Sequence, residues 1–310
     1  MDQTATTTER TENLAKLACA YAGLVWGLFW IPLRALDRAG VGGAWATAMF
    51  FAVPLAFAVP FALWRWRRLL GGGWRLHAIG ITAGVSLALY SNALIYTEVV
   101  RAILLFYLTP VWSTLLAWMW LKEAITASRL IAILLGLTGM AVIFGIDVGV
   151  PWPRNSGDWM GLASGAIWAV AAVLMRQDER TAVTEMTIAY LAWGTLASVL
   201  IALAPFSGAP RLPSPEAVGG TLFWFLPVMV FLVMPATFAF MWGTPLLSPG
   251  LVGLLFMTEI SVGAITAALW AGEPFGLREV AGVALITLAG LAEAMAALLV
   301  RRRGAGGSDS

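Results

Sequence analysis

The chain has 310 residues, of which 60% are hydrophobic and only 12% are charged, and its mean hydropathy is +0.83. A soluble domain of this length has too little interior to bury so much apolar surface, so the composition excludes an ordinary soluble protein and indicates a membrane protein. The net charge of +2 gives no indication of nucleic-acid binding. A single cysteine, Cys19, excludes an internal disulfide, and with one histidine, His77, the chain lacks the ligands of a usual zinc site. We therefore expect neither a metal nor a cofactor.

Ten apolar segments follow one another along the chain, each long enough to cross a hydrocarbon core of about 30 Å as a helix. They lie at about 15–34, 43–63, 76–96, 101–121, 128–147, 157–176, 183–205, 219–242, 249–270 and 277–300. We therefore expect an all-α membrane protein with ten transmembrane helices. It divides into a polar cytoplasmic tail (1–14), a first five-helix repeat (15–147), an inter-repeat loop (148–156), a second five-helix repeat (157–300) and a basic cytoplasmic tail (301–310).

Two short patterns occur once in each half. Gly23-Leu-Val-Trp26 precedes an arginine by eight residues, and so does Gly165-Ala-Ile-Trp168. Leu104-Leu105-Phe106 and Leu254-Leu255-Phe256 are each followed, at equal spacings, by a tryptophan and a glutamate. Duplication of an odd number of spans sets the two halves upside down relative to each other, and such inverted repeats build transporters with a site near the midplane. We expect two inverted repeats around a central cavity.

The distribution of Lys and Arg predicts the orientation of these spans. With the N terminus inside, 13 of the 19 basic residues fall in inner segments, and the six outer ones are Arg34, Arg38, Arg101, Arg154, Arg211 and Arg278. Cytoplasmic segments carry the excess of positive charge, so both termini should be cytoplasmic, in a multi-pass protein of the bacterial inner membrane. The equivalent residues Arg34 and Arg176 then lie on opposite faces, as an inverted duplication requires.

Glu259 lies near the centre of the ninth predicted span. An ionised side chain there costs on the order of 3 kcal/mol, so this residue must be neutral, paired or placed in a water-filled cavity. Three roles stay open: a proton site, a partner for a substrate ammonium group, or a protonated acid that donates a structural hydrogen bond.

Three prolines interrupt predicted spans, Pro110 in the fourth and Pro227 and Pro235 in the eighth. Each removes a backbone hydrogen bond, and its ring clashes with the preceding turn. The sequence is compatible with two roles for these prolines. They are hinges at which a helix bends as one gate opens and the other closes, or they are fixed kinks.

Polar and aromatic side chains within the spans form a candidate substrate pathway. Tyr90, Tyr107 and Trp168 each carry a polar group that needs a partner inside the membrane. The full set is Ser86, Tyr90, Asn92, Tyr96, Tyr107, Thr109, Trp168, Phe238 and Glu259. Hydrogen bonding between helices would produce the same pattern as a solute pathway. By contrast, Arg101, Glu98, Asp147 and His77 fall at span ends, where interfacial anchoring is expected.

Ten spans, a five-plus-five repeat, and Pro110 with Glu123 in the fourth span resemble the drug/metabolite transporter superfamily with EamA-type repeats. In the second half, Trp270-Ala-Gly-Glu273 at the end of the ninth predicted span matches the same family pattern. Phe106-Tyr107-Leu108-Thr109-Pro110 resembles the fourth-span signature of YddG-type exporters of aromatic amino acids, in which Tyr90 and Trp168 also match aromatic positions. Those relatives have Thr-Pro where this chain has Thr258-Glu259. The resemblance implies a basket of helices around a central cavity, with the fifth and tenth spans at the periphery, and facilitated efflux of neutral amino acids.

The leading hypothesis is an exporter that moves neutral, mainly aromatic and large apolar amino acids by alternating access. The alternative is a proton-coupled antiporter for drugs or other metabolites that uses Glu259. An intramembrane enzyme is a remote alternative, because the one histidine lies near an interface. The expected partners are a small-molecule substrate and membrane lipid, with no nucleic acid, and a monomer is the simplest oligomeric state.

Overall fold

The computed structural model describes residues 2–144, 152–178, 180–204, 212–256, 258–270, 272 and 275–289, and every regular element in these ranges is helical. Several features expected from the sequence lie outside the described residues. They are Asp147, the part of the inter-repeat loop at 148–151, Arg211, Glu273, the end of the tenth predicted span after residue 289, and the basic tail at 301–310.

The first half builds its spans from eight helices and one π-helical turn. In chain order they are α1 (Asp2–Gly27), α2 (Trp30–Arg38), α3 (Ala44–Trp64), α4 (Trp66–Gly71), α5 (Gly73–Tyr96), α6 (Val99–Phe106), α7 (Thr109–Leu116), the π turn η1 (Ala117–Leu121) and α8 (Ala127–Phe144). Helix α1 begins at Asp2, so the helix that forms the first span continues through the polar N-terminal residues. Glu12 and Lys16, one turn apart, form an ion pair of 2.9 Å that supports this extension.

The second half follows the same plan. Its elements are α9 (Ser156–Gln177), α10 (Val183–Leu203), α11 (Pro215–Val228), the π turn η4 (Met229–Val233), α12 (Met234–Gly243), the 3₁₀ turn η5 (Thr244–Leu246), α13 (Pro249–Phe256), α14 (Thr258–Trp270) and a helix over 277–289.

Eight helical stretches within the described residues are long and apolar enough to cross a membrane. They are Glu9–Arg38, Ala44–Trp64, Gly73–Tyr96, Arg101–Leu121, Ser156–Gln177, Val183–Leu203, Pro215–Leu246 and Leu251–Trp270. The fifth predicted span corresponds to a shorter apolar helix, Ala127–Ile143, and only part of the tenth is described. The protein is therefore a multi-pass, all-helical membrane protein, while the count of ten spans stays a prediction.

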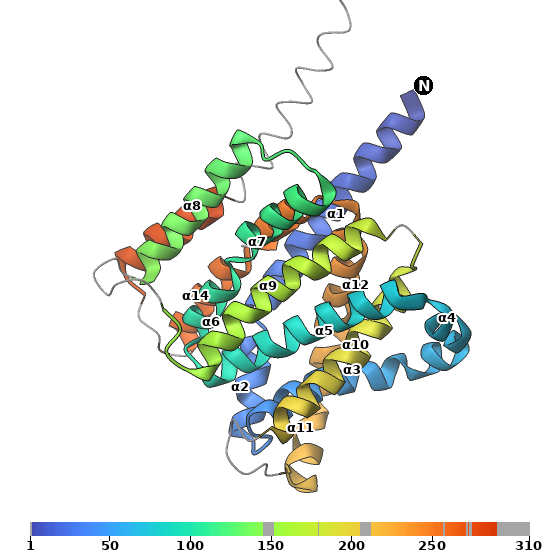
Figure 1. The fold of residues 1–310 in the computed structure, drawn as a ribbon. Coiled ribbons are helices and arrows are strands. Elements are labelled where there is room, and N and C mark those ends of the chain that lie inside the picture. The colour runs from blue at the N-terminus through green and yellow to red at the C-terminus, as the bar shows by residue number, and fades with distance from the viewer. Residues whose placement is uncertain are drawn as a thin grey trace, which may run out of the picture.

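The two halves interlock rather than lie side by side. Helix α1 of the first half packs on α12, α13 and α14 of the second, and α9 of the second half packs on α5, α6 and α7 of the first. Figure 1 shows α5 next to α9 and α10 across the front of the molecule. Each half thus supplies the helices that complete the packing of the other.

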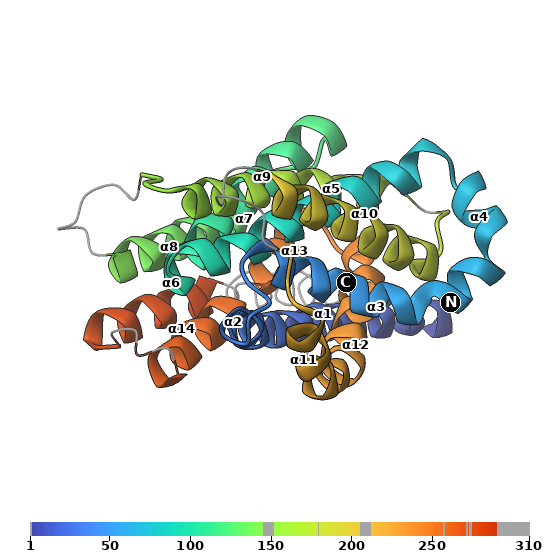
Figure 2. The ribbon, with the colours of Figure 1, turned by 90° about the horizontal axis from the view of Figure 1, so that it is seen from below.

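Helix α8 lies at one edge of the molecule, and α4 lies at the opposite edge, as both views show (Figures 1 and 2). The helix over 277–289 packs against α8 through two glycines: a Cβ on Gly139 would come within 2.7 Å of the carbonyl oxygen of Gly282. Small residues allow helix backbones to approach this closely in a membrane. The expected peripheral place of the fifth span agrees with this arrangement.

Two arginines mark the two ends of the bundle. Arg34 donates hydrogen bonds to the carbonyl oxygens of Leu94 and Thr97 at the C-terminal end of α5. Thr97 bonds to Asp158 in the first turn of α9, whereas Arg176, in the last turn of α9, donates to the carbonyl oxygen of Pro245. We name these the Asp158 end and the Arg176 end. Arg34 and Arg176 lie at opposite ends of the bundle, as the inverted arrangement predicts.

Candidate functional site

A small chamber lies at mid-height in the bundle, between the two halves. Its volume is about 10 Å³. Aromatic side chains form most of its wall, and the full lining is Trp26, Leu87, Tyr90, Phe106, Trp168, Phe240, Phe256 and Glu259. The central cavity expected from the sequence is therefore almost completely filled by side chains.

Equivalent positions of the two halves supply the aromatic side chains in pairs. Helices α6 and α13 are separated by 150 residues at both their first and their last positions, Val99–Phe106 and Pro249–Phe256. The same offset relates Phe106 to Phe256 and Tyr90 to Phe240, while the Gly-x-x-Trp pattern relates Trp26 to Trp168. A pseudo-twofold relation between the halves thus brings six aromatic residues to one point.

Glycines let the first helix of each half approach the fourth span of the other half. A Cβ on Gly27 would lie 2.9 Å from the carbonyl oxygen of Glu259, and one on Gly161 would lie 3.2 Å from that of Ala102. Distances this short leave no room for a side chain. These glycines are packing residues, and their close approach positions the chamber walls.

Glu259 breaks the symmetry of the chamber. By the offset of 150 residues, the first half has Thr109 at the equivalent position. The Glu259 side chain is buried, with 2% of its surface exposed. Tyr90 donates a hydrogen bond to Oε1, and Tyr107 is 2.6 Å from Oε2. Within the described part of the chain, no basic side chain forms an ion pair with this carboxyl group.

Tyr107 is shared between two acceptors. Its hydroxyl oxygen contacts the carbonyl oxygen of Phe256 as well as Oε2 of Glu259. A phenol has one proton to donate, so it satisfies one of the two oxygens as a donor. The second bond is complete when Glu259 carries a proton and donates it to the phenol oxygen. The geometry can therefore hold a proton on Glu259, between residues of both halves.

Trp168 is the exception among the three polar aromatic residues singled out in the sequence. Tyr90 and Tyr107 find a partner in Glu259, but Nε1 of Trp168 is buried without a hydrogen-bond partner. Buried N–H groups are nearly always paired, so an unpaired one in the wall of a chamber needs an explanation.

A vestibule opens at each end of the bundle. The one at the Asp158 end has a volume of about 870 Å³ and is lined by residues that include Trp45, Tyr96 and Ser214. The one at the Arg176 end measures about 650 Å³, and its lining includes Arg176, Asp178 and Met186. Since Trp168 lies midway along α9, the chamber lies between the two vestibules.

A continuous series of aromatic rings closes one side of the chamber. The ring of Phe240 lies 5.7 Å from that of Tyr190, which lies 5.5 Å from Phe51. Phe51 contacts Phe50 at 5.2 Å, and Phe50 lies 6.1 Å from Trp26. These edge-on and tilted contacts connect α12, α10, α3 and α1 around the chamber wall.

The structure brings together four of the predicted pathway residues, namely Tyr90, Tyr107, Trp168 and Glu259. The others have different surroundings. Ser86 donates to the carbonyl oxygen of Ser164 at 2.8 Å, and Thr109 donates to that of Phe106 at 2.5 Å, so both connect or stabilise helices. Asn92 donates to the carbonyl oxygen of Ala88, four residues earlier in the same helix.

Two further predicted residues lie outside the chamber. Tyr96 lines the vestibule at the Asp158 end, where its hydroxyl oxygen accepts a bond from the backbone N–H of Ala44. Phe238 is 48% exposed and points away from the chamber. Phe240, which the sequence reading missed, lies in the wall instead. The offset of 150 residues from Tyr90 was the signal that would have identified it.

Two of the three prolines, Pro110 and Pro235, lie next to an interruption of a helix. Pro110 lies in the first turn of α7, after a break at residues 107–108, and a Cβ on Gly253 would lie 3.3 Å from it. Pro235 begins α12 directly after the π turn, and Pro227 lies inside α11 on an exposed face. These are breaks in one conformation, so the choice between hinge and kink stays open.

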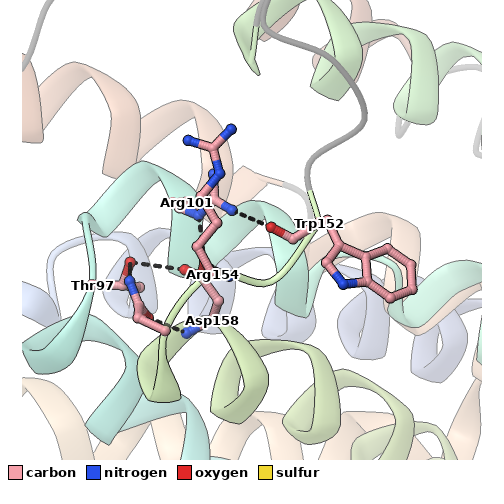
Figure 3. Close-up of polar contacts among 6 residues, drawn as sticks. Thr97, Arg101, Trp152, Arg154 and Asp158 are labelled. Carbon is pink, nitrogen blue, oxygen red and sulfur yellow. Dashed lines mark hydrogen bonds and ion pairs between the residues drawn. The ribbon is translucent and has the colours of Figure 1, made fainter.

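Polar contacts at the Asp158 end join the two halves (Figure 3). The Asp158 carboxylate accepts hydrogen bonds from Arg101 Nε at 2.7 Å, from Thr97 Oγ1 at 2.8 Å and from the backbone N–H of Arg154 at 2.8 Å. Arg101 also donates to the carbonyl oxygen of Trp152. The side chain of Asp158 is fully buried, so Arg101 is more than the interfacial anchor predicted from the sequence.

Asp178 organises the turn between α9 and α10 at the Arg176 end. Burial alone would raise the pKa of its carboxyl group, but hydrogen bonds from the Thr181 hydroxyl and from the backbone N–H groups of Arg180 and Thr181, together with the charge of Arg75, outweigh it. The net effect is that the pKa of Asp178 is lowered from its usual value.

The sequence profile of the EamA-like transporter family matches the chain twice, over residues 13–145 and 155–292. A solved structure, titled only as the crystal structure of a protein, aligns with a TM-score of 0.67 and 21% sequence identity, over 93% of this chain and 98% of that one. At this identity the likeness concerns the fold. None of the curated proteins matches the chain.

Proposed function

Because the chain belongs to the EamA-like transporter family, whose two repeats together cover most of its length, we propose that it exports neutral amino acids across the inner membrane of a bacterium. Members of this family are transporters of small molecules, which fits the expectation of a protein that is not an enzyme. The solutes are mainly amino acids with aromatic or large apolar side chains, together with related small metabolites. Transport proceeds by alternating access, without a cofactor.

The observation that carries this proposal is the position of the chamber between two vestibules. A carrier must expose one site to each side of the membrane in turn, and its inverted halves surround that site. Here the walls of the chamber come in equivalent pairs from the two halves, and one vestibule lies toward each end of the bundle from it. The closed chamber corresponds to a state between the two open ones.

The surface charge supports cytoplasmic termini. Arg65, Arg67, Arg68 and Arg75 belong to the end of the bundle at which Arg65 pairs with Glu185, near the start of α10. This is the Arg176 end, and a cluster of arginines beside a span is typical of the cytoplasmic side. The vestibule at the Arg176 end is then the cytoplasmic entrance.

The nature of the chamber wall supports the proposed solutes. Aromatic rings suit an apolar side chain, and few precisely placed polar groups suit the polar end of a small ligand. No described basic side chain lies in the chamber wall, which argues against multiply anionic solutes.

Counterflow in proteoliposomes tests the proposal. Purified protein is reconstituted, the vesicles are loaded with unlabelled amino acid, and entry of labelled Phe, Tyr, Trp, Met or Leu is followed, with protein-free vesicles as the control. We expect transient accumulation that the other members of the panel inhibit. If none of the five exchanges, the substrate assignment is wrong.

Proton-coupled antiport of drugs or other metabolites is a second candidate, favoured by the position of Glu259. Its carboxyl group is buried, and the sharing of Tyr107 between two acceptors is satisfied by a proton on Glu259. The variant Glu259→Gln separates the two mechanisms, because glutamine keeps the shape but cannot release a proton. If transport is coupled, a pH gradient should drive flux by the wild-type protein and should no longer drive it in this variant. If transport is not coupled, the gradient should drive flux by neither protein.

A further inference from the structure

Two polar groups in the chamber wall differ in what they offer to a ligand. The Glu259 carboxyl group offers acceptor oxygens, which only tyrosine hydroxyls contact among the described residues. The Trp168 indole offers an N–H donor with no partner. Both side chains are 2% exposed, and both line the same chamber.

We infer that the chamber recognises the zwitterionic head of an α-amino acid at two points, with the ammonium group at Glu259 and the carboxylate at Nε1 of Trp168. This inference rests on the proposed function and extends it to the groups that select the solute. It assigns Trp168, a residue of the pseudo-symmetric aromatic wall, to substrate binding.

The placement of the ligand ammonium group at Glu259 follows from the charge of the carboxylate and from the aromatic rings of the chamber wall. A carboxylate buried without a basic partner is stabilised by a cation more than by any neutral group. Aromatic faces attract the same cation, and Trp26, Phe106 and Phe256 line the same chamber as Glu259. A ligand ammonium group would therefore replace the interaction that a proton supplies when the chamber is empty.

The carboxylate half follows from the unpaired donor. An indole N–H that stays buried without an acceptor costs free energy, and a charged acceptor forms a stronger bond with it than a neutral one. A substrate carboxylate kept away from Glu259 by charge repulsion would be available to this donor. Among the described residues that line the chamber, Trp168 carries the one buried N–H donor without a partner.

The chamber must widen to admit the ligand. Its volume of about 10 Å³ holds at most a water molecule. Phe240 lines the chamber and contacts the rings of Trp26, Trp168, Tyr190 and Phe256, so its displacement would enlarge the chamber.

Three ligands that share one phenyl group test the two-point recognition. Phenylalanine carries both charged groups, phenethylamine carries only the ammonium group, and 3-phenylpropionate carries only the carboxylate. For the wild-type protein we expect phenylalanine to bind most tightly, phenethylamine about tenfold more weakly, and 3-phenylpropionate weakest of the three because it brings no cation to the Glu259 carboxyl group. Binding is measured by equilibrium dialysis of the labelled ligands with the full chain in detergent, and by inhibition of phenylalanine counterflow.

Variants then assign each group to its partner. Trp168→Phe keeps a ring but removes the N–H. It should therefore weaken the binding of phenylalanine about tenfold and leave the binding of phenethylamine unchanged. Trp26→Phe is the matched control, since it makes the same change at the equivalent position and should affect the two ligands equally. Glu259→Gln should weaken the binding of phenylalanine and the binding of phenethylamine to a similar extent.

Equal weakening of both ligands by Trp168→Phe would overturn the inference, and so would wild-type binding of phenethylamine or 3-phenylpropionate as tight as that of phenylalanine. The wild-type ligand series requires no variant, so it decides the question even if Trp168→Phe does not fold. If the ligands bind as expected but are not moved, the proposed function fails and the inference stands. If phenylalanine is exchanged but the ligand series shows no difference, the inference fails and the proposed function stands.

Discussion

Glu259 is held across the boundary between the two halves. Tyr90 and Tyr107 belong to the first half, and the carboxyl group that they contact belongs to the second. An acid at this depth in a membrane costs on the order of 3 kcal/mol unless it is neutral or compensated. The two phenols lower that cost, and in doing so they make the interaction between the halves depend on one side chain.

Removal of one phenol tests this dependence. Tyr107→Phe leaves the carbonyl oxygen of Phe256 and Oε2 of Glu259 without their shared partner, so we expect a loss of about 1–3 kcal/mol in stability. A lower midpoint of thermal unfolding in detergent would show the loss. Tyr21→Phe makes the same chemical change at a residue that is 39% exposed, and it should leave the midpoint unchanged.

Phe240 and Phe238 provide a second comparison at the scale of the residue. They lie two positions apart on α12, but Phe240 is 1% exposed in the chamber wall and Phe238 is 48% exposed. Phe240→Ala should cost roughly 3 kcal/mol through the cavity that it leaves, and it should change the rate of counterflow. Phe238→Ala should change the stability and the rate of counterflow only slightly. Equal effects of Phe238→Ala and Phe240→Ala would contradict the assignment of Phe240 to the wall.

Helix ends are fixed by charged groups that the apolar pattern does not reveal. Asp158 lies in the first turn of α9 and receives bonds from Thr97, Arg101 and the backbone of Arg154, which connects the start of the second half to the third and fourth spans of the first. The side chain of Asn155 accepts a bond from the backbone N–H of Asp158 and so caps the same helix. The connection stabilises one end of α9, along which the chamber is built.

Asp158→Asn should destabilise the protein by about 3–5 kcal/mol, because it removes a fully buried carboxylate that the guanidinium group of Arg101 contacts at 2.7 Å. Thermal unfolding and the yield of monodisperse protein in gel filtration measure the effect. Asp37→Asn is the control, as Asp37 is exposed and accepts a single backbone bond from Gly43. A shift no larger than that of the control would show that the contact contributes little.

The turn between α9 and α10 should show a dependence on pH. The pKa of Asp178 is lowered in the folded protein, so its charge contributes stability that is present above the unfolded value of about 3.9 and is lost as the pH falls through the lower folded value. Wild-type protein should therefore melt at a higher temperature than Asp178→Asn at neutral pH, and the difference should shrink in acid. A difference that stays constant down to about pH 2 would mean that the charge is not responsible.

At the scale of the whole molecule, the structure is closed at its centre and hollowed at both ends. The halves cross, so that α1 packs on α12 to α14 and α9 packs on α5 to α7. A relative rotation of the halves would move both fourth spans at once, since each is packed on the first helix of the other half. Under the alternating access that we propose, this rotation would open the paired aromatic wall toward one vestibule at a time.

Labelling from the two sides of the membrane tests the orientation. Cys19 is buried and is the sole cysteine, so its replacement by alanine provides a background without thiols. In that background, Arg176→Cys should react with an impermeant maleimide only from the cytoplasmic side, and Arg34→Cys only from the outside. Reaction of both from one side would contradict the inverted arrangement and the export pathway drawn from it.

The sequence alone was enough to predict a multi-pass helical protein of two related halves, the family, and the separation of Arg34 from Arg176. It was enough to single out Tyr90, Tyr107, Trp168 and Glu259 as residues that need partners. These predictions depend on the length and hydropathy of single segments and on repeated spacings, which are properties of the chain. The extension of α1 through the polar N-terminal residues was not expected, because that part of the chain lacks an apolar pattern.

Only the tertiary structure decided which of these groups meet. Whether Phe238 or Phe240 faces the chamber depends on the rotation of α12 about its axis, and the partner of Glu259 depends on how α14 crosses α5 and α6. Apolar spans are hydrophobic on all sides. Their sequences therefore specify that a segment crosses the membrane far more strongly than they specify how its helix is rotated within the bundle. The close approach of glycines to backbone carbonyl groups settles that rotation, because it is a contact between segments more than 50 residues apart.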